Sequence, residues 1–204
     1  MVSITLPDES TVDEVDIFLL FDDTGSFAGL VPQVQNLFND IVDQLQAQLP
    51  SADLAFGVGR FEDFGGPADD FSFEADVGRP FVLSQALLRT TNPEFETAIA
   101  EGLARSAPGS GGDGPESAIE ALFQVATGNG FDGDGDGSTL GSGPAGDPLT
   151  QTAPGSSGDV PAFSSHVGLA DGSIGGVGWR PDALRLVLLA TDICSVAPFD
   201  AGSG

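Results

Sequence analysis

The sequence predicts a doubly wound α/β fold with a mainly parallel sheet and one antiparallel edge strand. Two observations carry this prediction. Some strand-like segments are almost entirely apolar, as parallel strands buried on both faces are, and amphipathic helical segments lie between them. A chain of 204 residues with 40% hydrophobic residues can build one proper core, so we expect residues 1–204 to be a segment of a single domain.

The first half of the chain predicts two strands, the helix between them and an edge strand. Residues 15–21 are nearly all apolar and predict a buried strand. Residues 30–49 repeat apolar side chains every three or four positions up to a proline, which predicts a helix. Residues 54–61 are the second strand, and the alternating segment 71–77 is expected to be its hairpin partner, half exposed at the sheet edge.

The second half predicts two helices and a final strand. The helices cover residues 93–104 and 115–126, the latter with proline in its first turn. Residues 128–178 form a long tract rich in Gly, Asp, Ser and Pro, a length typical of functional or mobile loops. Residues 184–190 are a second buried strand, so the predicted order is β-α-β-β-α-α-β.

The charge of the chain excludes several classes of protein. The formal net charge is −25, from 31 acidic residues against 6 arginines and no lysine. A P-loop lysine and a Schiff-base lysine are therefore excluded. Such a surface repels nucleic acid and anionic membranes and attracts divalent cations. The composition is typical of proteins from salty environments, and it equally suits calcium-rich surroundings.

Single residues of reactive type narrow the possibilities further. Cys194 is the one cysteine, so no intrachain disulfide can form, and we expect it to be buried. His166 is the one histidine, which excludes zinc sites with several histidine ligands. Residues 1–7 contain no signal-peptide pattern, and no apolar run is long enough to span a membrane. If the protein is exported, its signal lies outside this segment.

Oxygen-bearing side chains gather at three places that follow strands or begin a helix. They are Asp22, Thr24 and Ser26 after the first strand, Asp113 and Glu116 at the start of the last helix, and Asp192 after the last strand. Loops at the carboxyl ends of parallel strands meet at one edge, so these oxygens could share one hard cation. Each group also has an ordinary explanation, as a helix cap, an acid at a helix N-terminus or a turn aspartate. Together they favour a metal site.

These segments resemble the metal-ion-dependent adhesion site of von Willebrand factor A domains, which have a Rossmann-like sheet. The closest likeness is to the I-like domain of integrin β subunits. Its Asp-Ser-Pro-Glu segment resembles Asp113-Gly114-Pro115-Glu116, its Gly-Trp-Arg matches Gly178-Trp179-Arg180, and its Phe-Val-Asp resembles Phe61-Glu62-Asp63. The resemblance covers roughly residues 14–127 and 176–196, and the joint spacing is more specific than any one motif.

The resemblance implies two cation sites. A central Mg²⁺ or Mn²⁺ would be held by Asp22, Thr24, Ser26, Glu116 and Asp192. A neighbouring Ca²⁺ would be held by Asp63, Asp113, the carbonyl of Pro115 and Glu116. The inhibitory third site of that family needs two acids where this chain has Gly29 and Leu30, so we expect it to be absent.

The resemblance also implies a function in adhesion and not in catalysis. An acidic side chain of a protein or carbohydrate partner would bind the open metal position, in a larger extracellular or surface protein. The family continues past the strand that ends at Asp192 with further strands and helices, whereas this chain stops at Gly204. We therefore expect the fold to be incomplete at its C-terminal end, with residues 128–178 as an insertion.

Two further motifs leave alternatives open. Asp132, Asp134 and Asp136 begin like a calcium loop, but Gly143 stands where an EF-hand needs glutamate, so the segment is either a looser calcium loop or a solvated acidic loop. Calcium would then make the chain a stiffened spacer of a surface adhesin. Residues 23–26 spell the Asp-Thr-Gly-Ser of aspartic proteases, a hydrolase alternative, yet no second copy occurs and a helix follows.

Overall fold

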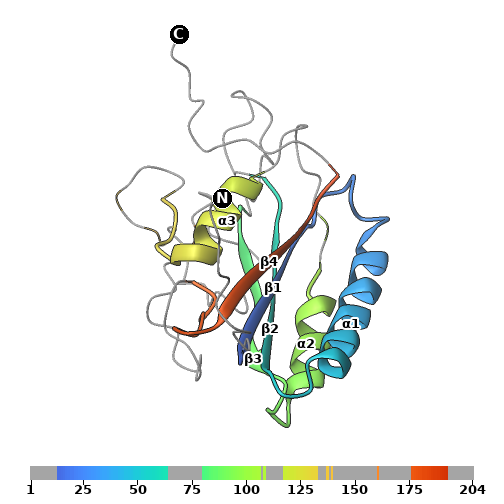
Figure 1. Ribbon diagram of the computed structural model, residues 1–204. Helices are drawn as coiled ribbons and strands as arrows, with labels where there is room; N and C mark the ends of the chain where they lie inside the picture. The colour runs from blue at the N-terminus through green and yellow to red at the C-terminus, as the bar shows by residue number, and fades with distance from the viewer. Residues whose placement is uncertain are drawn as a thin grey trace, which may run out of the picture.

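The computed structural model describes residues 13–63, 80–106, 108, 117–132, 137, 139, 160 and 176–192. These residues form an α/β fold, a mixed β-sheet with helices on both of its faces (Figure 1). The order of elements is the predicted β-α-β-β-α-α-β. Their bounds are β1 (Glu14–Asp22), α1 (Val31–Gln48), β2 (Asp53–Phe61), β3 (Val82–Arg89), α2 (Phe95–Ala104), α3 (Ala118–Thr127) and β4 (Leu184–Ala190).

The sheet has four strands in the order β3-β2-β1-β4. β1 lies at its centre and pairs in parallel with both β2 and β4, whereas β3 pairs antiparallel with β2 at one edge. This arrangement confirms the predicted mainly parallel sheet with one antiparallel edge strand. The carboxyl ends of β1, β2 and β4 consequently lie side by side, and we call this end of the sheet the carboxyl edge.

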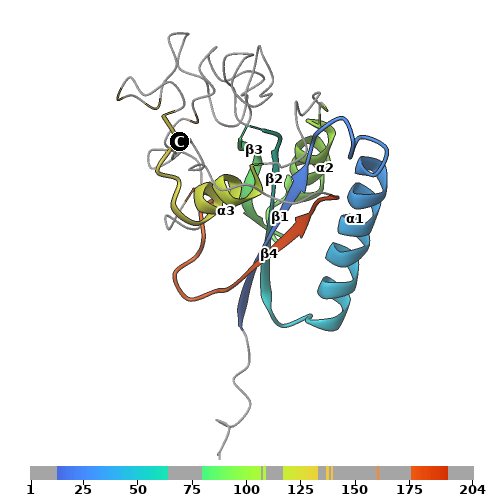
Figure 2. The same ribbon diagram turned by 90° about the horizontal axis from the view of Figure 1, so that it is seen from above.

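Alternate residues of β1 point into two separate cores. Ile17 and Leu19 belong to the core under α1 and α2, whereas Phe18 and Leu20 belong to the core under α3. Figure 2 shows α1 and α3 on opposite sides of the sheet. Both faces of β1 are therefore covered, which is why its sequence is apolar without alternation.

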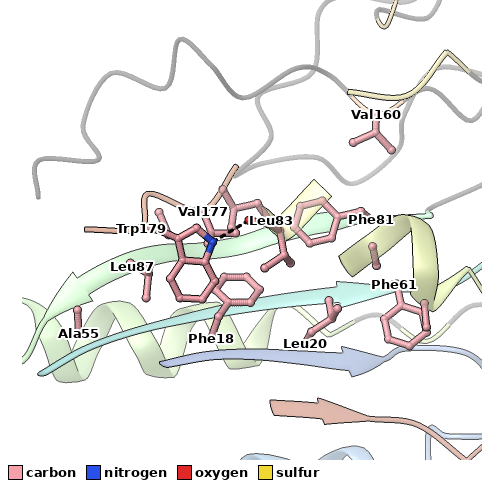
Figure 3. Packing of buried hydrophobic residues seen from close by; sticks show 14 residues of the cluster. Phe18, Leu20, Ala55, Phe61, Phe81, Leu83, Leu87, Val160, Val177 and Trp179 are labelled. Carbon is pink, nitrogen blue, oxygen red and sulfur yellow. Dashed lines mark hydrogen bonds between the residues drawn. The ribbon is translucent and has the colours of Figure 1, made fainter. Parts of the chain in front are cut away.

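The core under α3 is organised around two aromatic rings (Figure 3). Phe18 meets Trp179 edge-on, with ring centroids 6.4 Å apart, and the indole Nε1 of Trp179 donates to the carbonyl of Val125 at 3.0 Å. Gly57 and Gly59 of β2 make room for Phe18, because a Cβ on either residue would lie within 3.0 Å of its ring. Trp179 is thus a packing anchor of this core.

One strand prediction missed the described partner of β2. β2 is flanked by β1 on one side and by Val82–Arg89 on the other, whereas residues 71–77, predicted as its hairpin partner, lie outside the described residues. The true partner has a poorer alternation, since its apolar residues pack under α2 on one face and against Val177 and Trp179 on the other. An antiparallel edge strand covered on both faces does not show the period of two that the prediction relied on.

The last strand was also predicted to be buried on both faces, and this is wrong. β4 forms the free edge of the described sheet, and its large side chains Leu184, Leu186, Val187 and Leu189 are 38–48% exposed. Beside it, Leu37 of α1 is exposed and lines an open apolar hollow of about 320 Å³ together with β4. Within the described residues, no element covers the outer side of β4, so its apolar sequence meets solvent.

The amino end of the sheet is fastened by a buried ion pair. The Nε of Arg180 donates to Asp16 Oδ1 at 2.6 Å, and its backbone N–H donates to Oδ2 of the same carboxylate at 2.7 Å. The guanidinium also bonds the carbonyls of Val15 and Asp53. These contacts join the segment before β4 to β1 and β2. Among the described helices, none is both long and apolar enough to cross a membrane.

Candidate metal centre

Asp22 forms the buried base of the candidate site, which we call its floor. It is the last residue of β1 and is fully buried. Its Oδ1 accepts the backbone N–H of Thr24 at 2.9 Å and the Thr24 hydroxyl at 2.7 Å, and its Oδ2 accepts the Thr191 hydroxyl at 2.9 Å. All of these donors are neutral, so within the described part of the chain the carboxylate has no positively charged partner.

Two hydroxyl groups and a second carboxylate stand above this floor. The Thr24 and Ser26 hydroxyls are 3.2 Å apart, and the Ser26 hydroxyl is 3.5 Å from Asp192 Oδ1. Asp192 follows β4 by two residues, so β1 and β4 bring oxygens from opposite ends of the chain to one place. The structure thus brings together four of the predicted residues: Asp22, Thr24, Ser26 and Asp192.

One side of the candidate site is buried in the protein and the other side is open to solvent. Asp22 and Thr24 are buried, at 0% and 1% exposure, whereas Ser26 and Asp192 are exposed at the rim. The Thr24 hydroxyl gives its one proton to Asp22, which leaves its lone pairs available to another group. A ligand at this place would therefore meet the protein on one side and solvent on the other.

The capping explanation for Thr24 and Ser26 does not hold. α1 begins at Val31, its N-cap residue is Leu30, and no side chain caps the helix. The residues between Ser26 and Leu30 form turns, so both hydroxyls are too early in the chain to serve the helix. Their partners are Asp22 and Asp192 instead, and the turn explanation for Asp192 is likewise incomplete, since it reaches a residue 166 positions away.

Asp23 does not share in the site. It is fully buried, and its Oδ2 accepts from Arg60 at 2.5 Å while its Oδ1 accepts from the Ser106 hydroxyl. Both carboxylate oxygens of Asp23 thus accept hydrogen bonds from residues of other segments. This arrangement does not suit the protease interpretation of residues 23–26, which needs an aspartate that meets substrate and a second aspartate.

The predicted second site is only partly described. Asp63 is buried just past the end of β2, while Asp113, Pro115 and Glu116 lie outside the described residues. Ser117, which follows them, donates its backbone N–H and its hydroxyl to the carbonyl of Glu62 at 3.1 and 2.8 Å. The start of α3 is therefore tied to the end of β2 at the carboxyl edge.

The candidate calcium loop is also described in part. Asp132 Oδ2 accepts the backbone N–H of Gly137 at 2.8 Å, and Gly137 has φ +89°, a conformation that suits glycine. Asp134 and Asp136 lie outside the described residues. His166 and Cys194 lie outside them as well. The closed loop is compatible with both alternatives, a calcium loop and a solvated acidic loop.

The donor set suits a hard divalent cation. Two carboxylates and two hydroxyls offer only oxygen, which Mg²⁺, Mn²⁺ and Ca²⁺ prefer. Among the described residues, no three acidic, histidine or cysteine side chains lie close enough together to hold a metal ion. The two hydroxyls of Thr24 and Ser26 therefore supply half of the four candidate ligands. The buried carboxylate of Asp22 is the feature that fits best, because a charge taken out of water needs a positive partner.

Sequence reasoning missed the residues beneath the site. Thr191 was not among the predicted site residues, yet its hydroxyl donates to Asp22, and the pairing of Asp23 with Arg60 was not foreseen. The signal that could have predicted this pairing is that Arg60 is the one charged residue in the predicted strand 54–61. Comparison with protein-family models and with curated proteins finds no match for this chain.

Proposed function

We propose that this chain is a von Willebrand A-type domain, similar to the integrin β I-like domain, that binds a partner through a divalent cation. The observation that supports the proposal most is Asp22, a fully buried carboxylate whose partners among the described residues are all neutral and which lies next to two hydroxyls and Asp192. Asp22, Thr24, Ser26 and Asp192, with Glu116, would hold Mg²⁺ or Mn²⁺. Asp63, Asp113, Pro115 and Glu116 would hold Ca²⁺ beside it.

Each residue has a distinct task in this proposal. Asp22 supplies the buried negative charge, and Thr191 and the backbone of Thr24 fix the orientation of its carboxylate. Thr24 and Ser26 offer neutral oxygens, which keeps the negative charge of the site low. Asp192 stands at the exposed rim. The bound cation would supply a Lewis-acidic position that a partner carboxylate can occupy.

Metal binding can be tested with an aspartate at each end of β4. Asp192→Asn removes a proposed ligand at the carboxyl edge, and Asp182→Asn makes the same charge change in the exposed turn before the strand. We expect Mn²⁺ to bind wild type and Asp182→Asn alike and Asp192→Asn at least about tenfold more weakly, because even outer-shell partners contribute that much. Isothermal titration calorimetry measures all three dissociation constants.

Thermal unfolding supplies an independent measurement. At a cation concentration 100 times its dissociation constant, binding stabilises the folded state by about 2.7 kcal/mol. Mg²⁺ or Mn²⁺ should therefore raise the melting temperature of wild type above its value in EDTA, and Glu116→Ala should lose this response. A response to Ca²⁺ alone that Glu116→Ala retains would contradict the proposal and move the metal to residues 132–136.

A calcium-stiffened spacer is the second candidate, favoured by the closed loop between Asp132 and Gly137. The two functions differ in whether the cation keeps a position for an outside ligand. Paramagnetic relaxation of the protons of acetate by protein-bound Mn²⁺ reports on this position. Enhanced relaxation that Asp192→Asn abolishes supports adhesion, and metal binding without it supports the spacer.

A further inference from the structure

A buried arginine lies beneath the candidate metal centre and contacts the residues that follow two strands. Arg60 of β2 is 3% exposed, and its Nη1 donates to Asp23 Oδ2 at 2.5 Å and to Glu62 Oε1 at 3.2 Å. Asp23 directly follows Asp22 in the loop after β1. One guanidinium therefore holds the exit of β1 against the exit of β2, next to the floor of the site.

Asp23 and Glu62 extend this contact to other segments through their backbone and, for Asp23, its side chain. The backbone N–H of Asp23 donates to the carbonyl of Phe61 at 2.8 Å, and its Oδ1 accepts from Ser106, just after α2. The carbonyl of Glu62 accepts both donors of Ser117, at the start of α3. The ends of β1, β2 and α2 and the beginning of α3 thus meet in one buried polar network around Arg60.

We propose that Arg60 and Asp23 are positioning residues for the cation site, which act by holding the loop that carries Asp22, Thr24 and Ser26. This inference rests on the proposed function. The carbonyl of Phe61 holds the backbone N–H of residue 23 and Arg60 holds its side chain, so the loop leaves β1 in one direction. Thr24, the next residue, then has its hydroxyl over Asp22 without any helix cap to place it.

Charge attraction does not explain the role of Arg60. A positive side chain next to a cation site weakens cation binding, so Arg60 serves the site by geometry. Arg60 also pairs with the carboxylate of Asp23. Without Arg60, the buried carboxylate of Asp23 would lose its guanidinium partner one residue from Asp22 and would turn towards the cation or distort the loop, since removing one partner of a buried ion pair is costly.

The test removes the ion pair without changing the net charge. The double variant Asp23→Asn with Arg60→Met loses one negative and one positive charge, so the net charge stays the same, and it also removes the contact of Arg60 with Glu62. A change in affinity then reports on the geometry that the guanidinium maintains. We expect its Mn²⁺ dissociation constant to rise by about 10- to 100-fold, as for other outer-shell partners. In the metal-free protein, amide hydrogen exchange of residues 22–26 should become faster.

A second double variant is the matched control. Asp53→Asn with Arg89→Met removes an ion pair of 3.1 Å at the opposite end of β2, together with the 2.9 Å ion pair of Asp53 with Arg180, again at constant net charge. Its Mn²⁺ affinity should equal that of wild type. If the Asp23/Arg60 variant lowers the melting temperature but binds Mn²⁺ as tightly as wild type, the pair is structural only and the inference is wrong.

Two other results also decide the matter. If wild type binds no Mn²⁺, the proposed function fails and this inference fails with it, whereas wild-type binding with unchanged binding in the double variant overturns the inference alone. If the double variant does not fold, Arg60→Lys replaces it, because lysine keeps the charge but cannot present the planar guanidinium to both carboxylates. Weaker binding of Mn²⁺ by Arg60→Lys is then expected, and unchanged binding overturns the inference.

Discussion

Glu120 is an acidic side chain on the buried side of α3. It is 5% exposed, and its Oε1 accepts from the side-chain amide of Gln124 at 2.5 Å, one helical turn further on. Burial raises the pKa of Glu120, and the hydrogen bond from Gln124 lowers it by less. The folded protein thus holds a proton on this residue at pH values where the unfolded chain has released it.

The raised pKa predicts a stability that falls with pH. The contribution of Glu120 is fully present below the pKa of the unfolded chain and is lost as pH rises through the higher pKa of the folded state. Glu120→Gln should therefore stabilise the protein at pH 8, and less so towards pH 5. Urea unfolding across this range, with the exposed Glu101→Gln as control, measures the difference. A gain that does not depend on pH would contradict the prediction.

At the residue scale, the sequence predicted the candidate ligands of the site and not the residues that hold them in place. Asp22, Thr24 and Ser26 are two positions apart in one short loop, so their convergence follows from local sequence. The contact of Asp23 with Arg60 depends on the register that places Phe21 opposite Arg60, which a single sequence does not reveal. The hydroxyl of Thr191 holds Asp22 for the same reason, through the pairing of β1 with β4.

Among the elements, β1 and β4 have similar apolar sequences and opposite environments. Leu20 of β1 lies opposite Leu189 of β4 in the ladder, yet Leu20 is fully buried and Leu189 is 42% exposed. We expect Leu20→Ala to cost about 2–5 kcal/mol of unfolding free energy because it leaves a cavity, and Leu189→Ala less than about 1 kcal/mol. Urea unfolding of both variants measures this. Equal costs would mean that the outer side of β4 is covered.

The same contrast shows what periodicity can predict about elements. The strands at 14–22 and 53–61 and the helix at 31–48 were predicted within a residue or two, because the packing of both faces is written in their sequences. For β4 the identical pattern predicted its existence and bounds, but not its position at the edge. Strand order depends on contacts between distant segments, and β3 was missed because another segment alternates more regularly.

For the whole molecule, the net charge of −25 is the dominant electrostatic feature. The charges repel one another more strongly in the folded state, where they are closer together, so salt should stabilise the fold by screening them. The same charge opposes the approach of an acidic partner, whose carboxylate the proposed site would bind. Adhesion through this site would thus be favoured at high ionic strength, where long-range repulsion is screened and a direct bond to the cation is affected less.

These two effects of salt can be separated. Screening depends on ionic strength, whereas binding depends on the identity of the ion and on Asp192. At matched ionic strength, MgCl₂ should therefore raise the melting temperature of wild type more than NaCl does, and Asp192→Asn should reduce this excess while its response to NaCl stays the same. Differential scanning fluorimetry on both proteins suffices. If the extra rise in melting temperature is equal in wild type and variant, Mg²⁺ acts on the acidic surface in general. The proposal that the site at the carboxyl edge binds the cation would then be contradicted.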